Sequence, residues 1–489
     1  MKYIFIINPT AGRKIFAENF SAIVSQNLKK RGLEYKIYFS EYKGHIGEII
    51  KEELAQGEKC RFYVAGGDGT LLEAARTCIG NDNAELGIFP FGSGNDYIRQ
   101  FGDKMDFLDL DRQIDGYSIK VDAISTLEGD ALNICSIGLD AAVAYNMEKF
   151  KHLPFVNGSM AYEMSLAKCL CGHLGEEVTI KLKTTEGVKE FDGSYIFALA
   201  ANGQYYGGGY RGAPESMCND GLLDFVLITK PPIAKIPSMV GVYKKGEHLE
   251  SENFNGYLTF LRGYEMEIIA KNDVIANRDG ECDAVKREHF KIKPKAMNFI
   301  LPKGIEYRAN MNTERLILRP WHKDDFDDFF EIVSNEAVMV PSGAPVESDK
   351  EKAWDLFFKY RHNQKAYAIV LKETGKAIGA INYQKDNLRN PTMVNSLSLS
   401  YELNENYWGK GYMPEALNAM VENAFETTDI EVLSVGYHNN NMKSKKVIEK
   451  CGFVYDGMVR SGYRAADGIL YDTYNYSMTR EDYFSRKEK

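Results

Sequence analysis

The chain has 489 residues, of which 44% are hydrophobic and 26% are charged, with 30 Tyr and 26 Phe. This length predicts two or three domains, and the composition excludes disorder and collagen-like repeats. A net charge of −9 excludes a polycation that coats nucleic acid. The eight cysteines are scattered. No stretch approaches the ~20 apolar residues of a membrane span. We therefore expect a cytoplasmic protein with only peripheral membrane contact, at the inner face.

The first hundred residues alternate strand and helix signals. Strands are predicted at 3–7, 35–39, 61–65 and 86–89, and helices before residue 32, at 46–56 and at 71–79. Strand, glycine turn and helix repeated at this spacing predict a parallel α/β sheet.

The pattern changes after about residue 120. Helix signals become sparse, and strand-like runs appear at 178–184, 194–200, 222–229 and 266–270. This predicts an antiparallel β lobe beside the α/β lobe. A polar segment, taken as a linker over 306–312, then precedes a new alternating strand at 314–320, which opens an α+β domain of ordinary size.

Two glycine loops in the first lobe carry the strongest chemical signal. Gly66-Gly67-Asp68-Gly69-Thr70 follows one predicted strand, and Gly92-Ser93-Gly94-Asn95-Asp96 follows the next. Such loops bring backbone N–H groups and the positive end of a helix against phosphate oxygens. Thr70 and Glu73 are spaced as a capping box, which predicts a helix start at this point. An aspartate in each loop suits magnesium, so two structural turns without a ligand are the weaker interpretation.

These loops, with several motifs further along, resemble the diacylglycerol kinase catalytic family, including bacterial lipid kinases. The motifs occur in the family's order over about 300 residues: Asn8-Pro9-x-Ala11-Gly12, the two glycine loops, Asn133 to Gly138-x-Asp140, Asn202-Gly203 to Gly207-Gly208-Gly209, Asn219-Asp220-Gly221-Leu222-Leu223-Asp224 and Asp279-Gly280-Glu281.

The resemblance implies a role for each matching position. The nucleotide would be contacted by Asn8, Ser40, Gly66, Gly67, Asp68, Gly69, Thr70, Leu71, Leu72, Ser93 and Asn95. Magnesium would be held at Asp220 with the carbonyls of Met217 and Leu222, and organised through water by Asp68, Asp96 and Asp122. In Asp279-Gly280-Glu281, one carboxylate would take the proton of a lipid hydroxyl as that oxygen attacks the γ-phosphorus of ATP. The sequence does not decide between Asp279 and Glu281.

Two other interpretations of the first half stay open. NAD kinases share the Gly-Gly-Asp-Gly-Thr loop, but they continue with a second motif that differs from Gly92–Asp96. The third interpretation is a nucleotide- and CoA-binding scaffold without catalysis, which the intact acidic residues disfavour.

The second half carries another strand, glycine loop and helix. The run 396–403 alternates polar and apolar residues, which predicts a half-buried strand, and Trp408-Gly409-Lys410-Gly411-Tyr412-Met413 follows it. Pro414 suits a first helical turn, whose free N–H groups would face a diphosphate. Asn441-x-x-Ser444 then leads into a helix that Gly452 ends.

This half resembles the GNAT acetyltransferases, closest to the branch that acetylates the N-termini of ribosomal proteins. The resemblance implies that Gly409, Lys410, Gly411, Tyr412 and Met413 bind the pyrophosphate of acetyl-CoA. Asn441 and Ser444 would lie along the pantetheine and acetyl group. Glu402 is the candidate base, although a surface glutamate on a half-exposed strand is the more common explanation. The acceptor would be a primary amine, of a protein N-terminus or a small molecule.

We therefore predict an α/β plus β two-lobed lipid kinase of NAD kinase/diacylglycerol kinase-like fold, followed by an α+β GNAT domain. The expected boundaries are 1–122 for the nucleotide-binding lobe, 123–305 for the lipid lobe, whose last strand returns to the first lobe, and 313–489 for the GNAT domain. The cofactors would be ATP, Mg²⁺ and acetyl-CoA. The partners would be a lipid at a membrane surface and an amine, with no nucleic acid. Assembly as a homodimer is left open.

Overall fold

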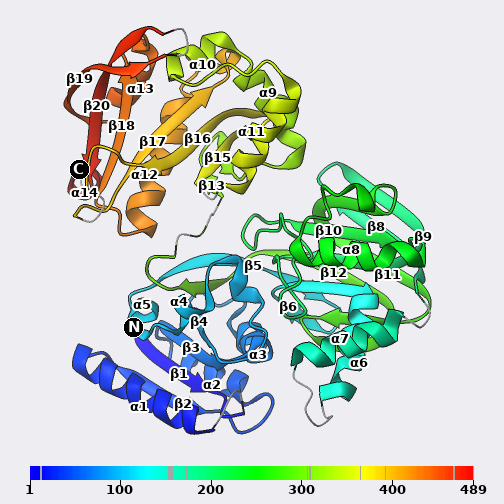
Figure 1. The fold of residues 1–489 in the computed structure, drawn as a ribbon. Coiled ribbons are helices and arrows are strands. Elements are labelled where there is room, and N and C mark those ends of the chain that lie inside the picture. Colours follow the sequence, from blue (N-terminus) through cyan, green and yellow to red (C-terminus); the bar gives the residue numbers. More distant parts are fainter. Residues whose placement is uncertain are drawn as a thin grey trace. The chain divides into compact units, whose positions relative to one another are not determined.

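The computed structural model describes residues 1–10, 14–151, 158–170, 174–305, 307, 310–363, 365–390, 393–465 and 468–487. Ala11 and Gly12 of the first motif, and part of the expected linker, lie outside the described residues. The chain divides into two compact units, Met1–Ile305 and Glu306–Lys489 (Figure 1).

The first part of unit 1 is a parallel sheet with helices. The elements are β1 (Lys2–Ile7), α1 (Lys14–Arg31), β2 (Tyr35–Phe39), α2 (His45–Leu54), β3 (Cys60–Gly66), α3 (Asp68–Cys78), β4 (Ala84–Pro90), α4 (Lys104–Leu108) and α5 (Leu110–Ile114). The strands lie in the order β4-β3-β1-β2 and are parallel. Because β4 reads Ala-Glu-Leu-Gly-Ile-Phe-Pro and is buried at every position, it behaves as a central strand covered on both faces.

The second part of unit 1 is mainly antiparallel. Its strands are β5 (Tyr117–Thr126), β6 (Gly129–Ala131), β7 (Ile134–Gly138), β8 (Glu176–Thr184), β9 (Gly187–Ala201), β10 (Leu223–Thr229), β11 (Leu258–Arg278) and β12 (Glu281–Leu301). The long strand β12 pairs with β11 in its first half and with β5 in its second half. Near its end β12 also runs parallel to β4, so this strand joins the antiparallel and the parallel parts of the unit in one sheet.

Helices are more prominent in the β region than the sequence indicates. The structure has α6 (Leu139–Lys151), α7 (Gly158–Leu170) and α8 (Ile236–Lys245) there. The sparse helix signals missed α7 because it is only weakly amphipathic: it mixes Gly, Ser, Met, Ala and Leu with few polar residues to mark an outer face.

Over its described residues, unit 2 is one eight-stranded sheet with helices. The strands are β13 (Met311–Asn312), β14 (Leu316–Arg319), β15 (Ala366–Leu371), β16 (Ala377–Lys385), β17 (Ser396–Leu403), β18 (Val432–His438), β19 (Val454–Arg464) and β20 (Leu470–Thr479). The helices are α9 (Phe326–Val333), α10 (Glu336–Ser342), α11 (Lys350–His362), α12 (Tyr412–Thr427), α13 (Met442–Lys450) and α14 (Arg480–Lys487). The sheet order is β13-β14-β15-β16-β17-β18-β20-β19.

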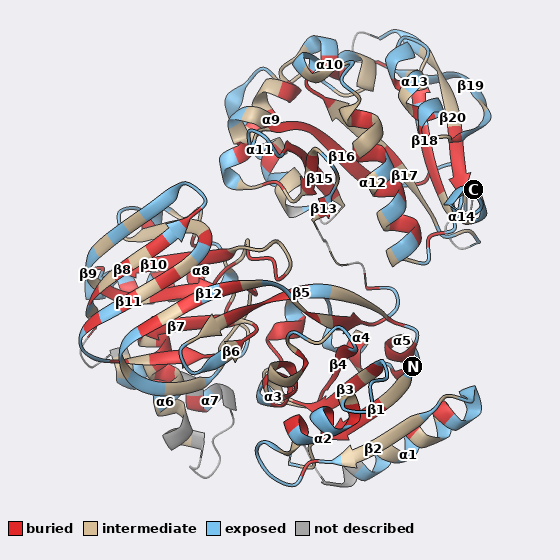
Figure 2. Ribbon diagram, turned by 180° about the vertical axis from the view of Figure 1, so that it is seen from behind, coloured by how far each residue is buried: buried red, intermediate tan, exposed pale blue. Residues whose placement is uncertain are grey.

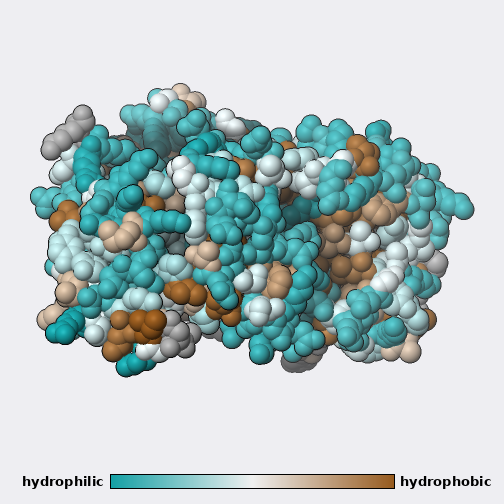
Figure 3. Space-filling view, turned by 90° about the horizontal axis from the view of Figure 1, so that it is seen from above, coloured by the Kyte–Doolittle hydropathy of each residue, from teal (hydrophilic) through white to brown (hydrophobic). Residues whose placement is uncertain are grey.

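The central strands of both sheets are the most buried elements (Figure 2). The face in Figure 3 is mainly hydrophilic, with apolar side chains in small groups. Within the described residues, none of the helices combines the length and the apolar character that a bilayer span requires.

Candidate active sites

Four predicted nucleotide-binding segments lie at one edge of the parallel sheet. Asn8 follows β1, Ser40 follows β2, Gly66–Asp68 ends β3 and Phe91–Asp96 follows β4. Because these strands are parallel, their carboxyl ends meet at the same edge. In the order β4-β3-β1-β2, the chain reverses its direction of winding between β1 and β3, which is where α/β sheets bind ligands.

The two glycine loops touch each other through their backbones. A Cβ on Gly92 would lie 2.5 Å from the Cα of Gly67, and one on Gly66 would lie 2.3 Å from the Thr70 Oγ1. Asn95 has a positive φ of 52° and donates its side-chain amide to the Gly92 carbonyl over 2.6 Å, which holds the second loop. Ser93 is exposed at its tip. The glycines therefore allow a close double loop whose backbone faces the edge.

The start of α3 differs from the expected capping box. The helix begins at Asp68 rather than near Leu71, so Thr70 lies inside it and accepts a hydrogen bond from the Asn8 side chain over 3.1 Å. Glu73 accepts the N–H groups of Gly44 and Ile46, both at 3.0 Å, and so caps α2 instead of its own helix. The capping-box prediction was wrong because the glycine-rich turn starts the helix earlier than its side chains indicate.

The first turn of α3 leaves backbone donors at the edge. The first i→i−4 bond of this helix runs from the Leu71 N–H to the Gly67 carbonyl over 3.0 Å. The N–H groups of Asp68, Gly69 and Thr70 precede it, as in any helix start, and suit an anion. The side chains of Leu71 and Leu72 are buried in the core, so only the backbone of this part can face a nucleotide.

Asp68 and Asp96 lie close together beneath the loops. The Tyr97 N–H approaches Asp68 at 3.4 Å, and Asp96 accepts the Gly208 N–H over 2.7 Å while its other oxygen pairs with Arg99 at 3.0 Å. Burial, together with the charge of Asp96, raises the pKa of Asp68 to about 6. Asp96 thereby ties the second glycine loop to Gly207–Gly209 of the β lobe.

Asp122 and Asp220 form a second acidic pair. Asp122 is fully buried, and its two oxygens accept the N–H groups of Gly221 and Lys295 at 2.7 and 2.6 Å. Asp220 accepts the Leu222 N–H over 3.0 Å. Burial raises the pKa of each to about 6.

These four acidic residues therefore form two pairs, Asp68 with Asp96 and Asp122 with Asp220. In the described part of the chain, no group of three or more His, Cys, Asp or Glu side chains lies ready to hold a metal ion directly, and the role of Asp68, Asp96 and Asp122 through water stays a prediction. The Asp220 loop still fits a hard cation by its oxygen donors. The neighbouring Asn219 Oδ1 is buried and has no hydrogen-bond partner among the described residues. The carbonyls of Met217 and Leu222 belong to the same loop.

Asp279 sits in a two-residue hairpin turn between β11 and β12. Arg278 pairs with Glu281, and the turn residues Asp279 and Gly280 have φ values of 53° and 94°, the pattern that favours Asp-Gly in a type I′ turn. In this turn the Asp279 carboxylate accepts hydrogen bonds from the N–H groups of Leu132, Asn133 and Ile134 at 2.5, 3.1 and 2.8 Å. Burial raises the pKa of Asp279, and these three donors oppose the rise.

Glu281 lies in an ion-pair cluster that the sequence did not reveal. Its carboxylate pairs with Lys43 at 3.0 Å and with Arg76 of α3 at 2.6 Å. Partial burial would raise the pKa of Glu281, but the two cations outweigh it and lower the pKa. Arg76 and Lys43 belong to no recognisable motif. They contact Glu281 only because of the turn between β11 and β12. The cluster links the nucleotide lobe to the turn.

In unit 2, β17 and β18 separate partway along their length. Their parallel pairing extends from Ser396–Val432 to Leu399–Val435 and stops there, although both strands continue. Beyond this point the Tyr401 hydroxyl bonds Ser444 of α13 over 2.8 Å. Asn441 caps α13 by accepting the Ser444 N–H over 3.1 Å. Tyr401, Asn441 and Ser444 therefore border the opening between the strands.

Glu402 points to the opposite face of β17. Leu397, Leu399, Tyr401 and Leu403 contribute to the core under α12, so alternation sends Glu402 toward α11. Its Oε2 is buried and has no hydrogen-bond partner among the described residues. Burial raises its pKa to about 7, and its charge contributes to the raised pKa of Tyr360 on α11. Glu402 is thus not the solvated surface glutamate that its half-exposed strand suggested.

The glycine loop of unit 2 leads into α12 as expected. Gly409 and Gly411 have φ values of 75° and 81°, and Gly411 is the residue before the helix. Arg315 from the start of the unit donates to the Lys410 carbonyl over 2.9 Å, pairs with Glu415 at 2.6 Å and covers the Tyr412 ring at 4.5 Å. Met413 is buried. The loop is therefore braced, with the free N–H groups of the first turn of α12 beside it.

Comparison with known proteins agrees with both units. Residues 2–126 match the diacylglycerol kinase catalytic domain, residues 133–301 the YegS C-terminal NAD kinase beta sandwich-like domain, and residues 315–454 an acetyltransferase (GNAT) domain. A diacylglycerol kinase of Bacillus subtilis (strain 168) is 26% identical over 307 residues, covering 61% of this chain and 95% of the relative.

Solved structures similar to each unit also exist. A diacylglycerol kinase from Bacillus anthracis str. Sterne is 18% identical with a TM-score of 0.45, over 62% of this chain and 98% of that one. A GNAT-family acetyltransferase from Bacillus anthracis is 22% identical with a TM-score of 0.32, over 35% of this chain and 99% of that one.

The family matches and the fold define a kinase and an acetyltransferase in one polypeptide. Unit 1 matches a diacylglycerol kinase catalytic domain and a YegS C-terminal domain, and unit 2 matches a GNAT acetyltransferase domain, which confirms the resemblance and the fold class expected from the sequence.

Proposed function

We propose that unit 1 transfers the γ-phosphoryl group of ATP to a lipid hydroxyl. The observation that carries this proposal is the Asp279 turn, which fixes a carboxylate in the same unit as the glycine loops on the strand ends. The glycine loops and the first turn of α3 would hold the phosphates through backbone N–H groups. The Asp220 loop would hold Mg²⁺, which neutralises phosphate charge when bound.

Asp279 is the better candidate for the base. A base works best when its pKa lies near the working pH, and burial raises that of Asp279 while two cations lower that of Glu281. Three backbone N–H groups fix the Asp279 carboxylate, with two contacts on each of its oxygens. Asp279 takes the hydroxyl proton as the new O–P bond forms, and the bond from the γ-phosphorus to ADP breaks. Glu281 positions Lys43 and Arg76.

A phosphorylation assay tests this function. Purified full-length chain with ATP and Mg²⁺ is given lipid micelles or NAD, beside Asp279→Ala as control. Phosphorylated lipid that disappears in the variant is expected. Turnover of NAD alone would overturn the lipid-kinase proposal and favour the NAD kinase alternative, which shares the glycine loop.

Unit 2, by the same reasoning, transfers acetyl from acetyl-CoA to a primary amine. The observation that carries this proposal is Glu402, whose Oε2 is buried and has no hydrogen-bond partner among the described residues, on the strand that separates from β18. The Gly409–Met413 loop and the first turn of α12 would bind the pyrophosphate. Glu402 takes a proton from the amine, the N–C bond forms, and the C–S bond breaks. Tyr401 or Ser444 would donate a proton to the leaving sulfur.

Calorimetric titration of the whole chain with acetyl-CoA tests the binding step. Saturable heat with wild type and a weaker isotherm with Gly411→Trp are expected, because a bulky side chain at φ 81° would disturb the loop. Equal isotherms would contradict the proposed site. A cytoplasmic protein that meets its lipid peripherally at a membrane surface fits both reactions.

A further inference from the structure

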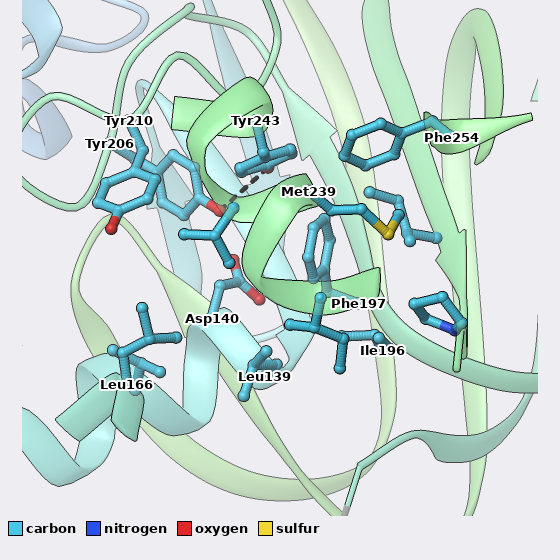
Figure 4. Close-up of a pocket in the computed structure, with 15 residues that line it drawn as sticks. Leu139, Asp140, Leu166, Ile196, Phe197, Tyr206, Tyr210, Met239, Tyr243 and Phe254 are labelled. Carbon is cyan, nitrogen blue, oxygen red and sulfur yellow. Dashed lines mark hydrogen bonds between the residues drawn. The ribbon is translucent and has the colours of Figure 1, made fainter. Parts of the chain in front are cut away.

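A pocket in unit 1 opens between α6, α7, α8 and the strands β9 and β10 (Figure 4). Its lining side chains are aliphatic, aromatic or proline except for Asp140, the second residue of α6. Burial raises the pKa of Asp140, and hydrogen bonds from the Ser136 side chain and the Ala141 N–H oppose the rise. This acid therefore has donors in its own chain, and the pocket around it belongs with the lipid site of the kinase proposed above.

Two buried acceptor atoms in unit 2 lack such donors. Asn382 of β16 is only 4% exposed, and its Oδ1 is buried without a hydrogen-bond partner among the described residues. The Oε2 of Glu402 on β17 is buried and unpartnered in the same way. Burial raises the pKa of Glu402 accordingly. Because an unpaired buried acceptor is costly, the two positions fit a ligand that brings hydrogen-bond donors.

The two acceptors lie on one face of neighbouring strands (Figure 1). In the pairing of β16 with β17, Ala380 is opposite Glu402 and Asn382 is opposite Ser400. Asn382 and Glu402 are therefore diagonal neighbours, with Cα atoms about 7–8 Å apart, and Ala380 places only a methyl group beside Glu402. A nitrogen that donates to two oxygens can bridge a gap of up to about 6 Å between them. One nitrogen can thus reach both side chains.

Tyr360 of α11 indicates which atom of Asn382 is left for a ligand. Burial raises the pKa of the Tyr360 hydroxyl, the charge of Glu402 raises it further, and a hydrogen bond from the Asn382 side chain opposes the rise. A bond that favours the deprotonated hydroxyl is donated to its oxygen, so Asn382 uses an amide N–H there. Both side chains thus approach the same hydroxyl, and each keeps an acceptor oxygen without a described partner.

A carboxylate beside a neutral acceptor suits a cation with at least two N–H groups. We infer that Asn382 and Glu402 together bind the acceptor nitrogen as a primary ammonium, which donates one N–H to each. This inference rests on the acetyl-transfer function proposed above. Glu402 takes one proton of the ammonium, while Asn382 holds the nitrogen beside the opening between β17 and β18. A second proton ends on the CoA sulfur as the N–C bond forms and the C–S bond breaks.

Cations that differ in their N–H groups but not in their charge test this inference. Butylamine, N-methylbutylamine and N,N-dimethylbutylamine are all cations at neutral pH, and the last has a single N–H. Each is titrated calorimetrically into the full chain saturated with CoA. We expect N,N-dimethylbutylamine to bind roughly tenfold more weakly than the other two, because one buried acceptor stays unpaired. Equal affinity across the series, or no saturable heat from any of the three, would overturn the inference.

Substitution of Asn382 separates hydrogen bonding from size. Asn382→Leu keeps a similar volume without an acceptor, so the preference over N,N-dimethylbutylamine should shrink to within about twofold. Asn382→Asp loses the N–H that reaches Tyr360 but keeps an acceptor, so it should retain the preference. Gln384→Ala, two residues along the same face and bonded to Ser400, is the matched control with the wild-type series expected. A preference that survives in Asn382→Leu, or is lost in Asn382→Asp, would overturn the inference.

Acetyl transfer to butylamine separates this inference from the function on which it rests. Asn382→Leu should raise KM for butylamine roughly tenfold and change KM for acetyl-CoA less than about twofold. Selective binding of butylamine without acetyl transfer would support the ammonium site and refute the acetyltransferase function. Acetyl transfer with an unchanged KM for butylamine in Asn382→Leu would keep the function and overturn the inference.

Discussion

The two units use their buried carboxylates differently. In unit 1, Asp122 and Asp279 accept two and three backbone N–H groups, and Asp96 accepts one beside its ion pair. In unit 2, Glu402 keeps an oxygen without a partner among the described residues. The carboxylates that accept the backbone N–H groups of a loop occur in recognisable motifs, because the glycines of the loop stand beside them in the sequence. Glu402, in contrast, belongs to none of the motifs recognised in the sequence.

The largest effect should come from Asp279→Asn. The amide has one acceptor oxygen and cannot take a proton, so we expect lipid phosphorylation to fall roughly 10²–10⁴-fold. Acetyl transfer by the same preparation should stay unchanged and serves as the folding control. A kinase rate within a factor of a few of wild type would mean that Asp279 only braces the turn, and the contrast with Glu402 would vanish.

Glu402→Gln should produce a comparable loss in the other unit, about 10²–10⁴-fold in acetyl transfer. Because the pKa of Glu402 is about 7, the wild-type rate should rise with pH through about 7 as the base ionises, and the variant should lack that rise. A pH–rate profile with a saturating amine measures both. An identical profile in the variant would exclude Glu402 as the base.

Gly411→Ala should have a smaller and more specific effect. Alanine at φ 81° costs about 1–2 kcal/mol, and the strained loop should also bind acetyl-CoA more weakly. Gly375→Ala is a matched control, because φ is 72° there, open space surrounds it, and it lies between β15 and β16. Denaturant unfolding should show similar losses for both, whereas only Gly411→Ala should change the titration. If both variants bound acetyl-CoA equally well, the Gly409–Met413 loop would not be the CoA-binding site.

The smallest effect concerns pH and stability. The pKa of Asp140 in the folded chain is about 6, above the unfolded value, so the folded state binds more protons between pH 4 and 6 and loses stability as pH rises through that window. Asp140→Leu should therefore stabilise unit 1 more at pH 7 than at pH 4, by about 2 kcal/mol. Urea unfolding at both values measures the difference. A pH-independent gain would mean that Asp140 stays protonated.

Much of this architecture follows from local sequence. The strand at 35–39 and the strand at 396–403 have the predicted bounds, because apolar alternation and flanking turns are local signals. The glycine loops were likewise recognised from their own residues. Glu73 shows the limit, since its spacing predicts a bond within α3 while its actual donors lie at the start of α2.

The remaining site features depend on long-range contacts. Arg76 and Lys43 meet Glu281 only because β11 and β12 form a long hairpin that reaches the first lobe. The pocket around Asp140 needs α6, α7 and α8, which sequence periodicity missed. Hydrogen-bond satisfaction of a carboxylate is a property of the assembled neighbours, so Glu402 could not be distinguished from a paired acid beforehand.

The most direct test measures both reactions on one preparation of the full chain. Lipid phosphorylation and acetyl transfer are followed for wild type, Asp279→Asn and Glu402→Gln under the same conditions. The account predicts that each variant loses one reaction and keeps the other. Loss of both reactions in either variant, or of neither, would contradict the assignment of one carboxylate base to each unit.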